Sequence, residues 1–206
     1  MLPFLETIAV SEGHYLNLPY HNKRYKATLL RFFNSIPEHS LADLLPTPPK
    51  SNELMRCRVT YNLDQFKVEF LQYVTKEINT LQCINDNNIT YDYKYNDRTQ
   101  LNLLLSQRGL SDEILIIKNN LVTDLSIANI IFQTGYRIVT PNQPLLLGTS
   151  LLRMIDEGIV YPIQIGQSDL KKLEGWQPIN AMRPFNMSNW RSMDTIYPAP
   201  EDVKNL

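Results

Sequence analysis

The chain has 206 residues, of which 20 are basic and 21 acidic, and its sequence pI is about 6.3. This length fits one large domain or two small ones that share a core. Proteins that bind nucleic acid normally carry a basic excess or a concentrated basic stripe, and this chain has neither. We therefore expect no nucleic-acid partner.

The cysteines, the histidines and the first ten residues exclude further classes. Cys57 and Cys83 are too few and too isolated for a disulfide framework or a cysteine-rich metal site. The three histidines are scattered and form no HExxH motif, so we expect no metal. The start, "MLPFLETIAV", has no basic region before its apolar run, and no apolar segment is long enough to span a bilayer. We expect a soluble, cytoplasmic protein without a membrane partner.

The first half of the chain alternates strand and helix patterns. Residues 4–10 and 14–19 read as two short strands around the turn "SEG". Residues 20–36 have apolar side chains at helical spacing and end before Pro37, which predicts a helix. Three prolines mark a loop within residues 41–54. Three successive strands are then predicted, at residues 55–62, 65–74 and 88–96.

The second half is richer in strands. Residues 99–110 predict a helix that ends near Gly109, and residues 112–126 and 128–141 predict two hairpins. A short helix follows at residues 149–158, with Thr149 as N-cap and Gly158 as C-cap. The remaining patterns predict a strand at 160–166, a helix at 169–175 and a strand at 176–185. We predict an α+β fold with a small N-terminal α/β half, residues 1–90, and a larger β-rich half, residues 91–206.

The stretch "YDYKYNDR" places Lys94 among three tyrosines. Successive side chains of a strand point to opposite faces, so Lys94 would face away from Tyr91, Tyr93 and Tyr95. Taken alone, this pattern is most simply a half-buried strand with a solvated lysine. No glycine-rich phosphate loop and no GxSxG motif offers another centre of chemistry.

Four separated segments give Lys94 a different context. They are "HNKR", "YKYNDR", "VTDLSIAN" with "LLLGTSLLR", and "INAMRPF". In this order and spacing the chain resembles, over most of its length, the class IV aminotransferase family of pyridoxal 5'-phosphate (PLP) enzymes, also called fold type IV. That family includes branched-chain and D-amino-acid aminotransferases and 4-amino-4-deoxychorismate lyase. The resemblance implies the fold type IV architecture, PLP as cofactor, a small-molecule substrate and a homodimer.

The resemblance also assigns the catalytic lysine and the acid that would pair with the cofactor ring. Lys94 stands at the position of the lysine that forms a Schiff base with PLP, a role that requires a partly desolvated amine or one next to cations. Asp124, thirty residues later, replaces the usual glutamate that keeps the ring nitrogen protonated. The structural alternatives are a cross-strand charge partner for Lys94 and a hairpin-end aspartate that bonds its own backbone for Asp124.

The remaining assignments concern the phosphate and the turn beside the cofactor. A phosphate needs backbone N–H groups and hydroxyls at a helix start, plus a cation. The arginine that the family often has two positions after its threonine is Leu151 here, and the nearest arginine is Arg153. Arg24 could also be a solvated helical arginine. The residues implied for cofactor binding, besides Lys94 and Asp124, are Arg24, Ser126, Ile127, Ala128, Asn129, Gly148, Thr149, Asn180 and Ala181.

The type of reaction is left open among three alternatives. "INAMRPF" is more similar to the corresponding segments of aminodeoxychorismate lyases than to those of branched-chain aminotransferases. This favours a lyase that converts 4-amino-4-deoxychorismate to 4-aminobenzoate and pyruvate, a step of folate precursor synthesis. The first alternative is an aminotransferase acting on a branched-chain or D-amino acid with a 2-oxo acid acceptor. The second is a catalytically silent relative that binds PLP.

Overall fold

The computed structural model describes residues 2–200, which form two compact units. Unit 1 comprises residues 2–75 and 93–97, and unit 2 comprises residues 76–92 and 98–200. The chain therefore enters unit 2, returns briefly to unit 1 around Lys94 and then completes unit 2. The sequence predicted the boundary after residue 90, whereas unit 2 begins at residue 76. Residues 76–92 belong to unit 2 because they contribute a strand to one of its sheets.

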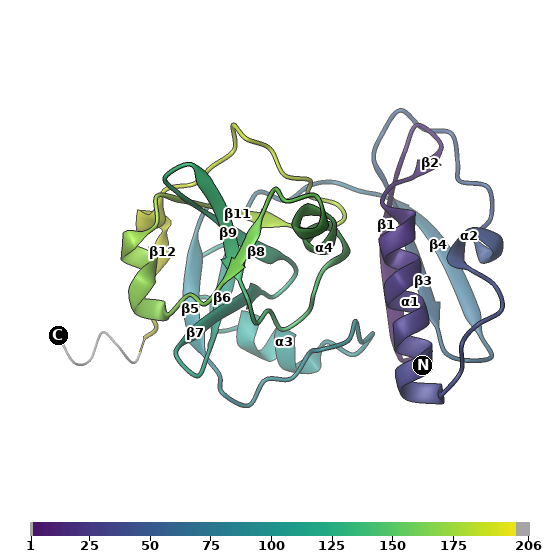
Figure 1. The fold of residues 1–206 in the computed structure, drawn as a ribbon, viewed down its shortest axis with the longest axis horizontal. Helices are drawn as coiled ribbons and strands as arrows, with labels where there is room; N and C mark the ends of the chain where they lie inside the picture. Colours follow the sequence, from purple (N-terminus) through teal and green to yellow (C-terminus); the bar gives the residue numbers. More distant parts are fainter. Residues whose placement is uncertain (1, 201–206) are drawn as a thin grey trace. The chain divides into compact units, whose positions relative to one another are not determined.

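Unit 1 is a four-stranded antiparallel sheet covered by a helix. The strand order is β2-β1-β3-β4, and the helix α1 runs along the sheet (Figure 1). A tight turn at Glu12 and Gly13, both with positive φ, joins the first two strands. The elements are β1 (Phe4–Ser11), β2 (His14–Tyr15), α1 (Leu18–Phe33), α2 (Leu41–Leu44), β3 (Met55–Tyr61) and β4 (Phe66–Gln72).

Apolar side chains at helical spacing bind α1 to this sheet. Tyr25 and Leu29 are buried against Ile8 of β1 and Val59 of β3. The helix ends because Asn34 adopts a left-handed conformation and donates its N–H to the Leu30 carbonyl. The helix and the strands predicted at residues 4–10, 55–62 and 65–74 are confirmed, whereas the strand predicted at 14–19 ends at Tyr15 because α1 already begins at Leu18.

Unit 2 packs two four-stranded sheets face to face. Their strand orders are β12-β5-β6-β7 and β10-β9-β8-β11. The helices are α3 (Thr99–Leu105) and α4 (Thr149–Asp156), with two short 3-10 segments, η1 (Gln167–Lys172) and η2 (Met193–Thr195). The strands are β5 (Leu81–Asn85), β6 (Glu113–Lys118), β7 (Leu121–Leu125), β8 (Asn129–Thr134), β9 (Arg137–Pro141), β10 (Tyr161–Ile163), β11 (Gly175–Ile179) and β12 (Ile196–Tyr197).

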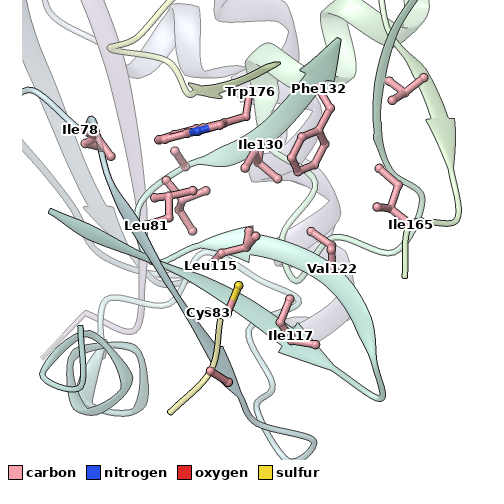
Figure 2. Packing of buried hydrophobic residues seen from close by; sticks show 14 residues of the cluster. Ile78, Leu81, Cys83, Leu115, Ile117, Val122, Ile130, Phe132, Ile165 and Trp176 are labelled. Carbon is pink, nitrogen blue, oxygen red and sulfur yellow. The ribbon is translucent and has the colours of Figure 1, made fainter. Parts of the chain in front are cut away.

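The two-residue period of β8 builds the core on both of its faces. Ile130 and Phe132 join the cluster between the two sheets, together with Leu115 of β6 and Trp176 of β11 (Figure 2). Ile131, which points the other way, joins a second cluster with residues of α4. Both hairpins predicted in this half are confirmed, with Asn119 and Asn120 in left-handed conformations at the first turn.

The predicted strand at residues 88–96 is wrong. Tyr95 forms one isolated bridge with Phe4, and the backbone bonds of this segment go to the start of β1: Leu5 N donates to Lys94 O at 3.0 Å, and Asn96 N donates to Pro3 O at 2.7 Å. Tyr95 packs in the core of unit 1, whereas Tyr91 belongs to unit 2. The alternating tyrosines therefore do not line one face of a strand, because this segment leaves one unit and enters the other.

Smaller corrections concern the ends of elements. Gly148, not Thr149, is the N-cap of α4, so Thr149 is its first helical residue. The helix predicted at 169–175 is the 3-10 segment η1, and the strand predicted at 176–185 ends at Ile179 because a turn follows, closed by paired backbone bonds between Asn180 and Arg183. Strand β5 was not predicted. It pairs in parallel with β6, a contact between segments that are distant along the chain.

Candidate functional site

A buried charged cluster lies beneath α1 in unit 1. Glu6 interrupts the apolar face of β1 and is fully buried, as is His21 of α1. Arg24, one helical turn further on, donates from Nε to Glu6 Oε1 at 2.7 Å and from Nη2 to Glu6 Oε2 at 2.5 Å. His21 Nδ1 lies 2.6 Å from the second of these oxygens. The helical spacing of three residues places both partners on the face that meets Glu6.

The charges of this cluster follow from the contacts. Burial alone would raise the pKa of Glu6, but the Arg24 guanidinium and its hydrogen bonds, with His21, lower it to about 2. Burial lowers the pKa of His21, and the nearby charges of Arg24 and Lys94 lower it too, against the opposing effect of Glu6. His21 is accordingly a neutral donor to Glu6, and Glu6 with Arg24 is the ion pair.

Lys94 is anchored to unit 1 through its backbone. Its carbonyl accepts the N–H of Leu5, the residue before Glu6, and its side chain is partly buried. Two residues later, the Asn96 side chain bonds both Leu2 O and the Arg58 guanidinium. Lys94 is therefore held in a fixed loop beside β1 and near the cluster of Glu6, His21 and Arg24.

In unit 2, a β-bulge directs Asp124. Val122 pairs with Ile117 and Leu125 pairs with Leu115, so two residues of β7, Thr123 and Asp124, stand opposite the single residue between those two on β6. An extra residue of this kind changes which face later side chains occupy. As a result Val122 and Leu125 both enter the core between the sheets, although they are three residues apart.

The Asp124 carboxylate is buried and bound by neutral groups. Oδ1 accepts from Asn129 Nδ2 at 2.7 Å, and Oδ2 accepts from Leu146 N at 3.0 Å. Among residues 2–200, no basic side chain forms an ion pair with it. Burial raises the pKa of Asp124 to about 7, although these hydrogen bonds act in the opposite direction. The carboxyl therefore ionises less readily than an exposed aspartate, and a cation close to it would favour the ionised form.

Asn129 connects this carboxylate to the start of α4. Its Nδ2 also donates to Leu146 O at 2.8 Å, and its Oδ1 accepts from Gly148 N at 3.1 Å. Gly148 precedes Thr149, and both Thr149 and Ser150 in the first turn of α4 are buried. A helix start of this kind presents backbone N–H groups and hydroxyls, which suit an anion.

The turn at Ser126–Ala128 is held from three directions. Arg98 Nη2 donates to Ser126 O at 2.8 Å, and the Ser126 hydroxyl donates to the buried Glu113 carboxyl at 2.9 Å. Burial raises the pKa of Glu113. Asn180 Nδ2 donates to Ile127 O at 2.9 Å, which ties the C-terminal segment to this turn.

Among the residues implied by the resemblance, the structure joins most of those in unit 2. Asp124, Asn129 and Gly148 form one hydrogen-bonded network, and Asn180 contacts the turn that contains Ser126, Ile127 and Ala128. Ala181 lies next to Asn180 in a partly exposed turn. Arg24 and Lys94 belong to unit 1. Arg153 pairs with Glu157 on the outer side of α4, at 3.7 Å.

Sequence reasoning missed Glu6, His21, Arg98 and Glu113. For Glu6 a signal was present, because an acidic residue at the buried position of an apolar strand needs a charged or hydrogen-bonding partner. For Glu113 and Arg98 no local pattern existed, since their partners lie 13 and 28 residues away.

Two kinds of feature are absent from residues 2–200. In this part of the chain no helix is long and apolar enough to cross a membrane. No group of three or more histidine, cysteine, aspartate or glutamate side chains there is arranged to hold a metal ion.

Comparison with known proteins identifies the family. No family model matches the chain. An uncharacterized protein of Haemophilus influenzae is 37% identical over 185 residues, which cover 88% of this chain and 98% of that protein. A crystal structure from Haemophilus somnus, described as a candidate 4-amino-4-deoxychorismate lyase, is 33% identical, with 90% of this chain and 98% of that chain covered and a TM-score of 0.85.

A more distant structure shares the fold. The PLP-bound form of a hypothetical aminotransferase from Mycobacterium tuberculosis is 12% identical, covers 98% of this chain and 85% of its own, and has a TM-score of 0.71. Together with the nearer relatives, this shows that the chain belongs to the class IV aminotransferase family, the fold type IV enzymes that use PLP. The α+β fold and the family resemblance predicted from the sequence are confirmed.

Proposed function

We propose that this enzyme is a PLP-dependent lyase that converts 4-amino-4-deoxychorismate to 4-aminobenzoate and pyruvate. The observation that carries the proposal is the relative from Haemophilus somnus, which is described as a candidate for this activity and matches over 98% of its length. The segment "INAMRPF" adds support, because it is similar to the corresponding segment of such lyases. It follows that the enzyme needs no amino acceptor.

The residues of unit 2 fit the cofactor chemically. Asp124 is a buried carboxylate with neutral partners and a pKa of about 7, so a protonated ring nitrogen would supply the missing positive charge. Gly148 and Thr149, at the start of α4, suit the phosphate. Asn180 and Ala181 follow β11, and Asn180 is already bonded to the turn at Ile127. These features support PLP as the cofactor of this chain.

In unit 1 we assign roles to Lys94 and Arg24. The Lys94 amine would hold the cofactor aldehyde covalently until substrate binds, and the guanidinium of Arg24 would attract the phosphate. Glu6 contributes by fixing Arg24 through two hydrogen bonds and by accepting the Nδ1–H of His21, which burial keeps neutral. A guanidinium fixed in this way retains its charge and can still donate elsewhere, because it carries five N–H groups.

When bound, PLP would supply an electron-withdrawing ring that accepts electrons from the substrate carbon bearing the amino group. Lys94 Nζ acts as the general base that takes the proton from this carbon. The carbon–oxygen bond to the enolpyruvyl group then breaks, the departing enol takes up a proton to become pyruvate, and the six-membered ring becomes aromatic. Asp124 would remain ionised and keep the ring nitrogen protonated when the cofactor is bound.

One assay separates the lyase from its alternatives. Purified enzyme is incubated with PLP and 4-amino-4-deoxychorismate without any 2-oxo acid, and 4-aminobenzoate and pyruvate are measured. Equal amounts of both products support the lyase. An absolute requirement for a 2-oxo acid would indicate the aminotransferase, and bound PLP without any turnover would indicate the silent relative.

The covalent link to Lys94 is tested separately. Borohydride should attach PLP to the protein, and peptide mass spectrometry should find it at Lys94. A label on another lysine, or none at all, would contradict the assignment.

We also propose a cytoplasmic homodimer, for which the family resemblance is the support. Light scattering would contradict the dimer if it gave the mass of one 23.9 kDa chain.

A further inference from the structure

The Asn129 side chain uses both of its N–H groups within the protein. One goes to Asp124 Oδ1 at 2.7 Å and the other to Leu146 O at 2.8 Å, while Oδ1 accepts from Gly148 N at 3.1 Å. A primary amide has two donor hydrogens. Asn129, which is 5% exposed, therefore has no donor left for a ligand, and its role is to hold other groups.

Gly148 is adapted to this amide. Its φ of −66° and ψ of 148° are accessible to any residue, so backbone conformation does not require glycine here. A Cβ at this position, however, would lie 2.1 Å from Asn129 Oδ1 and 3.3 Å from Asn129 Cγ. The three atoms nearest to such a Cβ all belong to Asn129. Glycine is needed because this one side chain approaches so closely.

We propose that Asn129 is a positioning residue that fixes the Asp124 carboxylate and the start of α4 relative to each other, so that the ring end and the phosphate end of the cofactor are bound as one unit. The inference rests on the proposed use of PLP. Two groups that belong to different elements, β7 and α4, are set by one amide, and loosening it would misplace both. Catalytic groups have to be held by such supporting contacts to keep their geometry.

The simpler explanation is that Asn129 only stabilises the fold, and a matched control in the same unit tests it. The Gln177 side chain, also buried, makes the same number of bonds: Nε2 donates to Asn186 O at 2.9 Å and to Asn189 O at 3.1 Å, and Oε1 accepts from Asn186 N at 2.9 Å. None of these partners is assigned to the cofactor. Gln177→Ala should cost stability but leave cofactor affinity unchanged.

The experiment measures the affinity of the cofactor-free protein for PLP, for pyridoxal, which lacks the phosphate, and for inorganic phosphate. Asn129→Ala should weaken pyridoxal and phosphate binding by about tenfold each, as expected for a lost buried hydrogen-bond partner. Asp124→Asn should weaken pyridoxal binding alone. If Asn129→Ala does not fold, Asn129→Ser, which keeps a shorter acceptor, takes its place.

A double-mutant cycle provides the decisive test. Gly148→Ala alone should weaken PLP binding by about tenfold or more, because the new methyl group overlaps Asn129. In the Asn129→Ala background the same change should cost less than about threefold, because the atoms that the methyl group would meet are gone. This near-complete loss of the Gly148 effect is the expected result.

Three results would overturn the inference. Additive losses in the cycle would show that Gly148 does not act through Asn129. If Asn129→Ala weakened the binding of pyridoxal alone or of phosphate alone, the ring end and the phosphate end of the cofactor site would be independent of each other. Equal losses of affinity from Gln177→Ala would reduce Asn129 to a structural role. If the wild-type protein itself binds no PLP, the proposed function fails as well, which distinguishes that case from the other three.

Discussion

Replacing Asp124 with asparagine should remove a pH-dependent component from the stability of the cofactor-free protein. Burial raises the pKa of this carboxyl from 3.8 to about 7 in the folded state. The folded protein therefore prefers the protonated form, and its stability is highest below the unfolded pKa and falls as pH rises through the folded one. Asparagine resembles the protonated carboxyl in shape and cannot ionise.

The expected magnitude follows from linkage. Between about pH 5 and about pH 7 the unfolded carboxyl is ionised and the folded one is largely protonated, so stability falls by about 1.4 kcal/mol per pH unit. The slope falls near pH 7, where the folded carboxyl is half ionised, so over this range the wild type should lose about 2 kcal/mol relative to Asp124→Asn. Because only the difference between the two proteins is used, other titrating groups cancel.

The assay is urea-induced unfolding of both cofactor-free proteins across this pH range. Saturating PLP should flatten the wild-type profile, because a cationic ring nitrogen favours the ionised carboxylate. Parallel pH profiles of the two cofactor-free proteins would refute the reasoning, since they would show that Asp124 keeps an ordinary pKa when folded. The charge complementarity proposed for the ring nitrogen would then lose its basis.

Three further predictions address Lys94, the buried ion pair and the core. Lys94→Ala should fold normally and lose turnover and the borohydride-dependent label; retained activity would contradict the assignment of this lysine. Glu6→Gln should cost about 3 kcal/mol or more of unfolding free energy, because it leaves Arg24 buried without its partner. The wild type should lose the contribution of Glu6 as pH falls from about 4.5 to about 2, so equal acid profiles for the two proteins would argue against the pair. Phe132→Ala should destabilise by about 3–5 kcal/mol in thermal or urea unfolding. Tyr136→Ala, at an exposed turn of the same hairpin, should change stability by less than about 0.5 kcal/mol, and similar losses for both would contradict the core packing.

Local patterns explain why several elements could be predicted. The apolar spacing of α1 and the asparagine turn between β6 and β7 are set by neighbouring residues, so each is visible in a short window. Strand β5 could not be found in this way, because its parallel partner β6 lies beyond α3. The tyrosine alternation around Lys94 was misleading for the same reason, since it depends on which unit each tyrosine joins.

In the candidate site, too, some features follow from the sequence and others only from the tertiary structure. The sequence by itself determined the family, because Lys94, Asp124 and Gly148 stand at spacings that match it, and the chemistry of these residue types suits a PLP enzyme. Only the tertiary structure decided how Asp124 is oriented, through a bulge in β7 that no local pattern marks. It also decided why residue 148 is glycine and why Glu6 is acidic, because both answers are contacts with side chains far along the chain: Asn129 in one case and Arg24 in the other. Spacing along a chain records which chemistry is present, whereas burial and contact between distant segments set the charge and orientation of each group.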